Sequence, residues 1–141
     1  MKHKLLTATI LGLSLVTAPL YAAPARELSE PIVELMPVVK KLTPELKLSA
    51  EQQAKLKTWM ETAPAKRQAV EAEALEMRKQ LRAAILSGAD DAVRQDLLNQ
   101  VGQKETQLLT MRSKCTDFLR ELLTPEQFTQ VREAYATSRA R

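Results

Sequence analysis

Two long amphipathic segments, joined by a short turn, constrain the fold of this chain more than any other feature. Before the turn, apolar residues recur at intervals of three or four positions, at Val70, Ala74, Met77, Leu81 and Ile85. After it, the same spacing places a second series on one side of a helix, namely Val93, Leu97, Val101, Leu108, Met111, Cys115, Leu119 and Leu122. This period predicts two α-helices that each carry one apolar stripe. At 1.5 Å per residue, the second helix, over about 92–122, would be roughly 45 Å long.

The pair Ser87-Gly88 lies between the two segments. Glycine tolerates the left-handed conformation that closes a helix, and Asp90 or Asp91 can cap the next one. Glycine is otherwise scarce, and the common residues are helix formers, so little else in the chain favours strands. The predicted fold class is all-α: an elongated antiparallel helical hairpin with short flanking helices.

Prolines divide the chain before the hairpin. Pro31 and Pro37 interrupt an apolar stretch, which predicts an irregular leader with a short helix. Thr43-Pro44-Glu45 predicts a turn or a new helix start, because proline is favoured at the first helical position behind a threonine cap. A helix over about 49–62 follows, and Pro64 is predicted to interrupt it before the long hairpin helix begins.

The first residues have the layout of a signal peptide. Three of the first four residues are Lys2, His3 and Lys4, and the stretch 5–20 carries no charge. That stretch is shorter than the roughly 20 apolar residues of a membrane span, and small residues follow it. We therefore expect cleavage near Ala22 and export to the periplasm. The predicted parts are a signal peptide over 1–22, a leader over 23–47 and a helical domain over 48–141.

Charge and composition exclude several classes of protein. Removing residues 1–22 takes away two of the 21 basic residues and none of the 17 acidic ones, which leaves 119 residues with a formal charge of +2. A dedicated nucleic-acid binder would carry a clustered excess of Lys and Arg, so no nucleic-acid partner is expected. No second apolar run is long enough to span a membrane, which predicts no membrane insertion after processing.

Catalytic and metal-binding patterns are absent from the sequence. The only histidine, His3, lies in the predicted signal peptide, so no base accompanies the single cysteine. We find no phosphate-binding glycine-rich loop and no metal cluster, and the Asp90-Asp91 pair lacks the alternating ligands of a calcium site. The sequence therefore predicts a protein that is not an enzyme and has no cofactor or metal.

Two five-residue segments match each other and carry the most specific pattern in the chain. They are Leu48-Ser49-Ala50-Glu51-Gln52 and Leu123-Thr124-Pro125-Glu126-Gln127. Each reads as a capping box, in which the Ser or Thr side chain accepts a backbone N–H and the Gln side chain reaches back to the cap residue's own N–H. The motif residues are therefore expected to be structural: Leu48, Ser49, Gln52, Leu123, Thr124 and Gln127.

Paired boxes that bracket a helical hairpin resemble the LTxxQ-motif proteins of the Gram-negative periplasm, the Spy/CpxP family, over roughly 46–135. The resemblance implies a cradle-shaped antiparallel homodimer that binds unfolded or partly folded envelope proteins without ATP. In the CpxP branch it also implies a negative regulator that restrains an envelope-stress sensor kinase. A metal-responsive role of the zinc-resistance type is a further alternative, which is weakened because those relatives carry His-rich segments and this chain does not.

Residues that could bind such client proteins cluster on the helices before the turn. Two interpretations stay open for them, a solvated charged face or an apolar floor rimmed by cations, and methionine suits the second because its flexible side chain adapts to varied partners. The candidates are Lys55, Met60, Lys66, Arg67, Met77, Arg78, Leu81 and Arg82.

The lone cysteine, Cys115, also leaves two interpretations open. It shares the apolar stripe of the second long helix, which favours a buried small side chain. In an oxidising compartment it could instead form an intersubunit disulfide. A thin hairpin in so short a chain buries only part of its apolar surface, and this predicts a homodimer independently of the cysteine.

Overall fold

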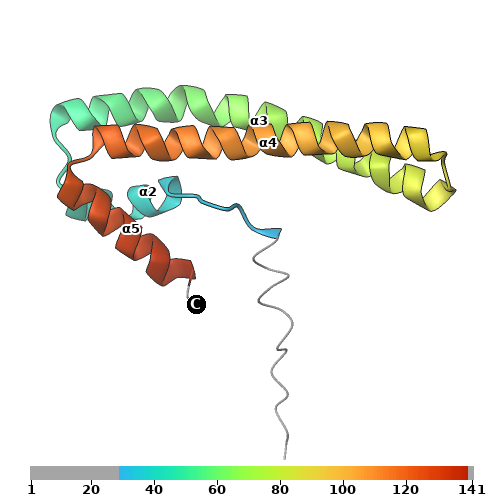
Figure 1. Cartoon of the computed structure of the whole chain (residues 1–141). Coiled ribbons are helices and arrows are strands. Elements are labelled where there is room, and N and C mark those ends of the chain that lie inside the picture. Colours follow the sequence, from blue (N-terminus) through green and yellow to red (C-terminus); the bar gives the residue numbers. More distant parts are fainter. Residues whose placement is uncertain (1–28, 140–141) are drawn as a thin grey trace, which may run out of the picture. The chain divides into compact units, whose positions relative to one another are not determined.

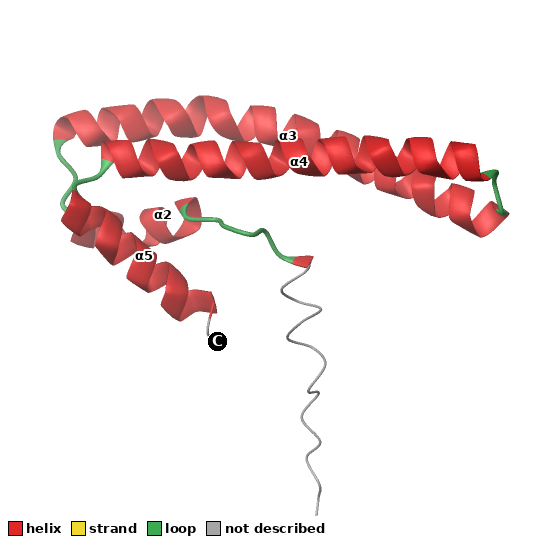
Figure 2. Ribbon diagram, viewed as in Figure 1, coloured by secondary structure: helices red, strands yellow, loops and turns green. Residues whose placement is uncertain are grey.

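The computed structural model describes residues 29–139, and the predicted signal peptide lies outside them. Four α-helices and no strand occur in this part (Figures 1 and 2). They are α2 (Met36–Leu46), α3 (Ala50–Ser87), α4 (Asp91–Leu122) and α5 (Pro125–Arg139). All four belong to one compact unit, Ile32–Arg141, so the predicted all-α hairpin with short flanking helices is confirmed.

The helices α3 and α4 lie antiparallel along a seam with alternating intervals of three and four residues, as in coiled coils (Figure 1). Buried or half-buried residues of α3 at this spacing are Met60, Ala63, Arg67, Val70, Ala74, Met77, Leu81 and Ala84. Those of α4 are Leu97, Val101, Lys104, Leu108, Met111, Cys115, Phe118 and Leu122. Two residues of the predicted stripes, Ile85 and Val93, do not join the seam, since their side chains are 53% and 49% exposed.

The turn between these helices forms where the sequence predicted it. Gly88 has a φ of 70°, and its N–H donates to the carbonyls of Ala84 and Ile85. Asp90 takes the N-cap position of α4, but its side chain makes no capping hydrogen bond. Asp90 therefore lies at the predicted N-cap position, but its side chain does not cap the helix.

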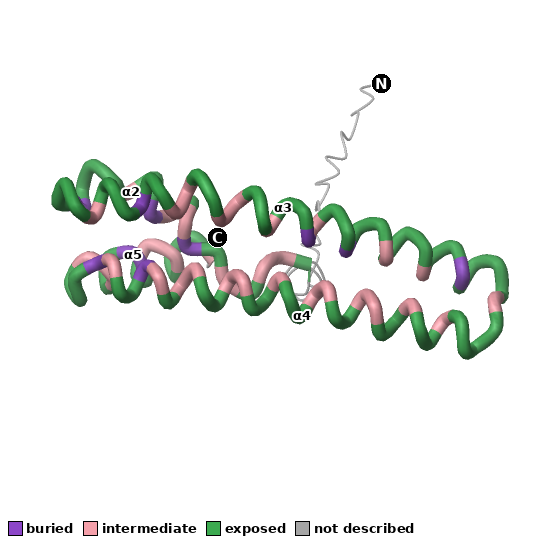
Figure 3. The backbone as a smooth tube through the Cα atoms, turned by 90° about the horizontal axis from the view of Figure 1, so that it is seen from above, coloured by how far each residue is buried: buried purple, intermediate pink, exposed green. Residues whose placement is uncertain are grey.

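The core lies at the end of the hairpin away from Gly88, where α2 and α5 pack together against it (Figures 1 and 3). Val39 of α2, Leu119 of α4 and Val131 of α5 are fully buried there. The helix α2, which the sequence placed in the leader, thus contributes to the same core as the hairpin. Within residues 29–139, none of the helices combines the length and apolarity that crossing a membrane requires.

Two predicted interruptions are wrong. Pro44 lies inside α2 and Pro64 lies inside α3, which continues to Ser87. A proline removes only one backbone donor, and α3 has many other hydrogen bonds and a long contact with α4 that outweigh the cost of about 3 kcal/mol. The long helix therefore starts at the first capping box, behind Ser49, rather than at Pro64.

We expect Pro64→Ala to raise the free energy of unfolding by about 2 kcal/mol, because alanine restores the missing donor to the carbonyl of Met60 and removes the ring clash. Thermal unfolding followed by circular dichroism measures the change. An unchanged or lower stability would mean that packing of the half-buried proline ring outweighs the helix defect.

Lys47 is the one non-glycine residue with positive φ in the part of the chain that the structure describes, and it ends α2 at a φ of 48°. Glycine relieves the left-handed strain, so Lys47→Gly should stabilise the protein by about 1 kcal/mol. Lys41→Gly, in the interior of the same helix, should destabilise it by about 1 kcal/mol. Urea titrations of both variants test this; the same sign at both positions would contradict it.

Candidate binding face

Both capping boxes form. At the start of α3, the Ser49 hydroxyl accepts from the N–H of Gln52 at 3.1 Å, and the Ser49 N–H donates to Gln52 Oε1 at 2.9 Å. At the start of α5, the Thr124 hydroxyl accepts from the N–H of Gln127 at 3.2 Å, and the Thr124 N–H donates to Gln127 Oε1 at 2.9 Å. The capping role predicted for these four residues is confirmed.

The two boxes also bind each other, which the sequence analysis missed. Gln52 Nε2 donates to Gln127 Oε1 at 2.8 Å and to the carbonyl of Leu122, the last residue of α4, at 2.9 Å. Gln127 Nε2 donates to the carbonyl of Leu46, the last residue of α2, at 2.8 Å. We call the pair Gln52 and Gln127 the glutamine bridge. A signal for it existed, because a capping box uses only the amide oxygen and leaves two amide donors to be satisfied.

Charged pairs define one side of the α3–α4 hairpin. Arg112 of α4 lies 3.6 Å from Glu71 of α3, and Arg78 Nε donates to Glu105 Oε1 at 2.8 Å. Glu71 and Arg78 are seven residues apart on α3, and so are Glu105 and Arg112 on α4. Residues seven apart lie on the same side of a coiled-coil helix, so the two ion pairs form one row along the hairpin. Leu119 lies seven residues beyond Arg112 and continues this row into the core, to which α2 and α5 also contribute.

In the other direction the same row continues to residues that no other helix in the described part of the chain covers. Ile85 lies seven residues beyond Arg78, and Leu98 lies seven residues before Glu105. A shallow groove passes between them and includes Leu81. The side of the hairpin that α2 and α5 cover at one end therefore carries exposed aliphatic residues at the other, among charged and polar ones, and no other helix of residues 29–139 covers them.

Four exposed aliphatic residues make up this surface, which we call the open face: Leu75, Ile85, Leu98 and Leu109, exposed by 67%, 53%, 49% and 47%. Between the last two, Gly102 lies in the middle of α4, where a Cβ would meet no atom within 4 Å. A glycine there costs about 1 kcal/mol of helix stability, and no packing among residues 29–139 requires it. It leaves room beside Leu98 for a closely approaching partner.

The structure does not gather the eight predicted client-binding residues on one surface. Four of them, Met60, Arg67, Met77 and Leu81, are half-buried in the seam. Arg78 is paired with Glu105 at the centre of the open face, and Arg82 is exposed three residues before Ile85.

The other two lie away from the open face. Lys55 pairs with Glu51 at 2.6 Å, and Lys66 is exposed. Sequence reasoning missed the open face itself, although apolar residues one position off the stripe were a signal for it.

Cys115 lies half-buried beside the core. Near it, the rings of Trp59 and Phe118 stack with centroids 4.1 Å apart and planes 8° from parallel. Burial raises the pKa of the Cys115 thiol, and the Trp59 hydrogen bond and the charges of Arg112 and Arg67 oppose this only in part. An intersubunit disulfide through Cys115 stays a prediction.

Because the thiolate is the nucleophile, the raised pKa of Cys115 should make its alkylation slower than that of a free thiol near neutral pH. The rate should still be rising at a pH where free cysteine has levelled off. Iodoacetamide labelling followed by mass spectrometry between pH 7 and pH 10, with urea-unfolded protein as the control, measures this. Equal rates in the folded and unfolded protein would contradict the burial of the thiol.

Among residues 29–139, no group of three or more His, Cys, Asp or Glu side chains is arranged to hold a metal ion. Comparison with known proteins gives one finding. The family model described as LTXXQ motif family protein matches residues 35–134, a range that contains both capping boxes and the open face. No curated protein and no solved structure matches the chain.

Proposed function

Because the chain belongs to the LTXXQ motif family, which includes Spy/CpxP-type periplasmic proteins, we propose that it is a non-enzymatic periplasmic chaperone or envelope-stress adaptor. It binds unfolded or partly folded envelope proteins without ATP. The open face is the observation that carries the proposal, since exposed aliphatic residues gathered on one side of a small protein mark an interaction site.

The chemistry of the open face suits flexible and varied partners. Its leucine and isoleucine side chains offer apolar contact, while Arg78 and Glu105 at its centre already satisfy each other's charge. The surface is shallow rather than a closed pocket, so it does not select one ligand shape. Contacts of this kind are weak individually and exchange quickly, which allows a client to fold while bound.

A homodimer forms part of this proposal. Beyond the core, α3 and α4 have only each other as neighbours in the described part of the chain, and Leu119 is the one fully buried residue of α4. A second copy would bury more of the apolar surface. Analytical ultracentrifugation of the mature protein tests it, and a monomer at micromolar concentration would contradict it.

The function is tested by aggregation of a chemically unfolded model protein, followed by light scattering with and without the mature protein. The assay contains a chelator and no ATP. Suppression at near-stoichiometric ratios is the expected result, and it would make metal dispensable. A helical, dimeric sample that gives no suppression would favour the alternative, a negative regulator that binds the periplasmic domain of a sensor kinase.

A further inference from the structure

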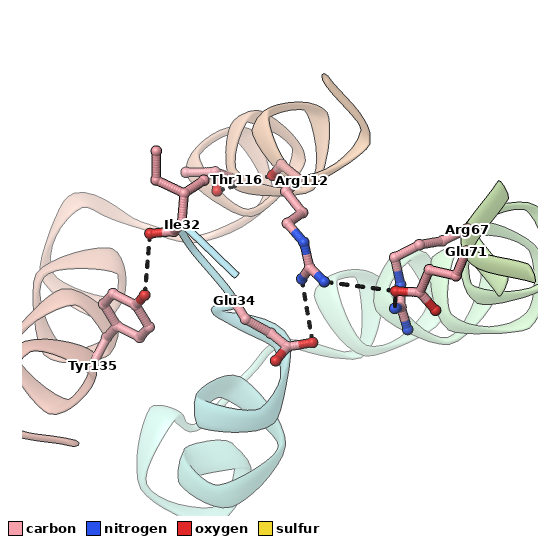
Figure 4. A network of polar contacts seen from close by, with 7 residues as sticks. All are labelled: Ile32, Glu34, Arg67, Glu71, Arg112, Thr116 and Tyr135. Carbon is pink, nitrogen blue, oxygen red and sulfur yellow. Dashed lines mark hydrogen bonds and ion pairs between the residues drawn. The ribbon is translucent and has the colours of Figure 1, made fainter. Parts of the chain in front are cut away.

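The segment before α2 is bound to the core and to α5. Residues 32–35 have no helical or strand structure, yet Leu35 is buried in the core and Val33 packs against it. The hydroxyl of Tyr135 in α5 donates to the carbonyl of Ile32 at 3.4 Å (Figure 4). The protein thus holds a short peptide segment of its own, through aliphatic contacts and a hydrogen bond from a side chain to the backbone of the segment.

A carboxylate lies between the aliphatic residues of this segment. Glu34 points toward Arg112 of α4, which lies 3.4 Å away (Figure 4). The Arg112 side chain is only 14% exposed and also pairs with Glu71, which in turn pairs with Arg67. Two arginines and two glutamates therefore make up a neutral cluster, and the segment supplies one of the two negative charges.

Withdrawing Glu34 would leave this cluster with two arginines and one glutamate. An uncompensated arginine that is mostly removed from water is costly, so the site favours another carboxylate in the same place. The outer part of the segment is not tightly enclosed, since the Glu34 side chain is 43% exposed and Ile32 is 68% exposed. Displacement of this part would leave the helices themselves intact.

We infer that Arg112 and Tyr135 form a binding site for peptide segments in which an acidic residue lies between aliphatic ones, and that residues 32–35 occupy it as a built-in competitor. This inference rests on the proposed function and names a class of client segment. The site adjoins the side of the hairpin that bears the open face, so one client chain can contact both. A tethered competitor lowers the apparent affinity for free peptides by the fraction of time that it occupies the site.

The probe is a fluorescein-labelled peptide with blocked ends that has the sequence of residues 31–36, Pro-Ile-Val-Glu-Leu-Met. Its binding to the mature protein is measured by fluorescence anisotropy. Glu34→Gln in the protein weakens the tethered competitor and should tighten peptide binding by about tenfold. Arg112→Gln should abolish binding, and a peptide with Gln in place of its Glu should bind at least about tenfold more weakly to the Glu34→Gln protein.

Tyr135→Phe keeps the ring in place and removes only the hydroxyl, so it tests the site even if Arg112→Gln fails to fold. It should weaken binding of the peptide to the Glu34→Gln protein by several-fold. Equal affinity for the wild type and Glu34→Gln, or equal affinity for the two peptides, would overturn the inference.

The aggregation assay separates this inference from the proposed function. Client protection by the wild type together with no peptide preference would refute only the acidic–aliphatic site. Protection that rises in Glu34→Gln, and falls when the peptide is added, would support the site as one that clients use. Absence of protection in every variant, with peptide binding intact, would refute the chaperone function and leave the peptide site standing.

Discussion

Replacing Leu98 and Leu109 together by glutamine is expected to reduce protection of an unfolded client by about tenfold, measured as the concentration that halves light scattering. Both side chains belong to the open face, and about half of each is exposed, so a bound client can still cover apolar area there. Glutamine is a good helix former and adds no charge beside Glu105. Helical content should therefore stay unchanged by circular dichroism.

The matched control replaces Leu86 and Val93 by glutamine. These residues are exposed by 80% and 49%, but they lie off the row that contains Ile85 and Leu98. The control removes at least as much exposed apolar surface from the same hairpin. An equal loss of protection in both double variants would mean that general surface hydrophobicity, and not the open face, binds the client.

The hairpin could be predicted because its determinants are local. An apolar stripe and a glycine after Ser87 act within a few residues of each other, and the structure has the turn at the predicted place. The prediction of a helix break at Pro64 was wrong because its determinant is not local. Contact with α4 decides whether a proline is tolerated inside α3, and local preference does not contain that information.

The open face could be predicted only in part, because the period of the seam differs from that of a straight helix. A strict seven-residue repeat selects Ala84, whereas a stripe drawn at the ordinary helical period continues to Ile85. The difference of one residue turns Ile85 from an expected seam residue into an exposed one. The glutamine bridge could not be predicted from local sequence patterns, because its hydrogen bonds join residues 70 to 81 positions apart in the chain.

Gln52→Ala and Gln127→Ala should each lower the free energy of unfolding by about 2 to 3 kcal/mol, which is more than the loss of a cap alone. Each substitution removes the reciprocal half of a capping box and leaves a helix-end carbonyl, Leu122 or Leu46, without its amide donor. Each also removes the amide contact between the two side chains. Urea denaturation of the single and double variants measures the effects.

The double variant distinguishes a bridge from two separate caps. Because Gln52 and Gln127 share a hydrogen bond, the double variant should lose about 1 kcal/mol less than the sum of the two single variants. Gln130→Ala, at an exposed position on α5, is the matched control and should change stability by less than about 0.5 kcal/mol. Additive losses would mean that the two boxes act independently, and that the core alone holds α2 and α5 against the hairpin.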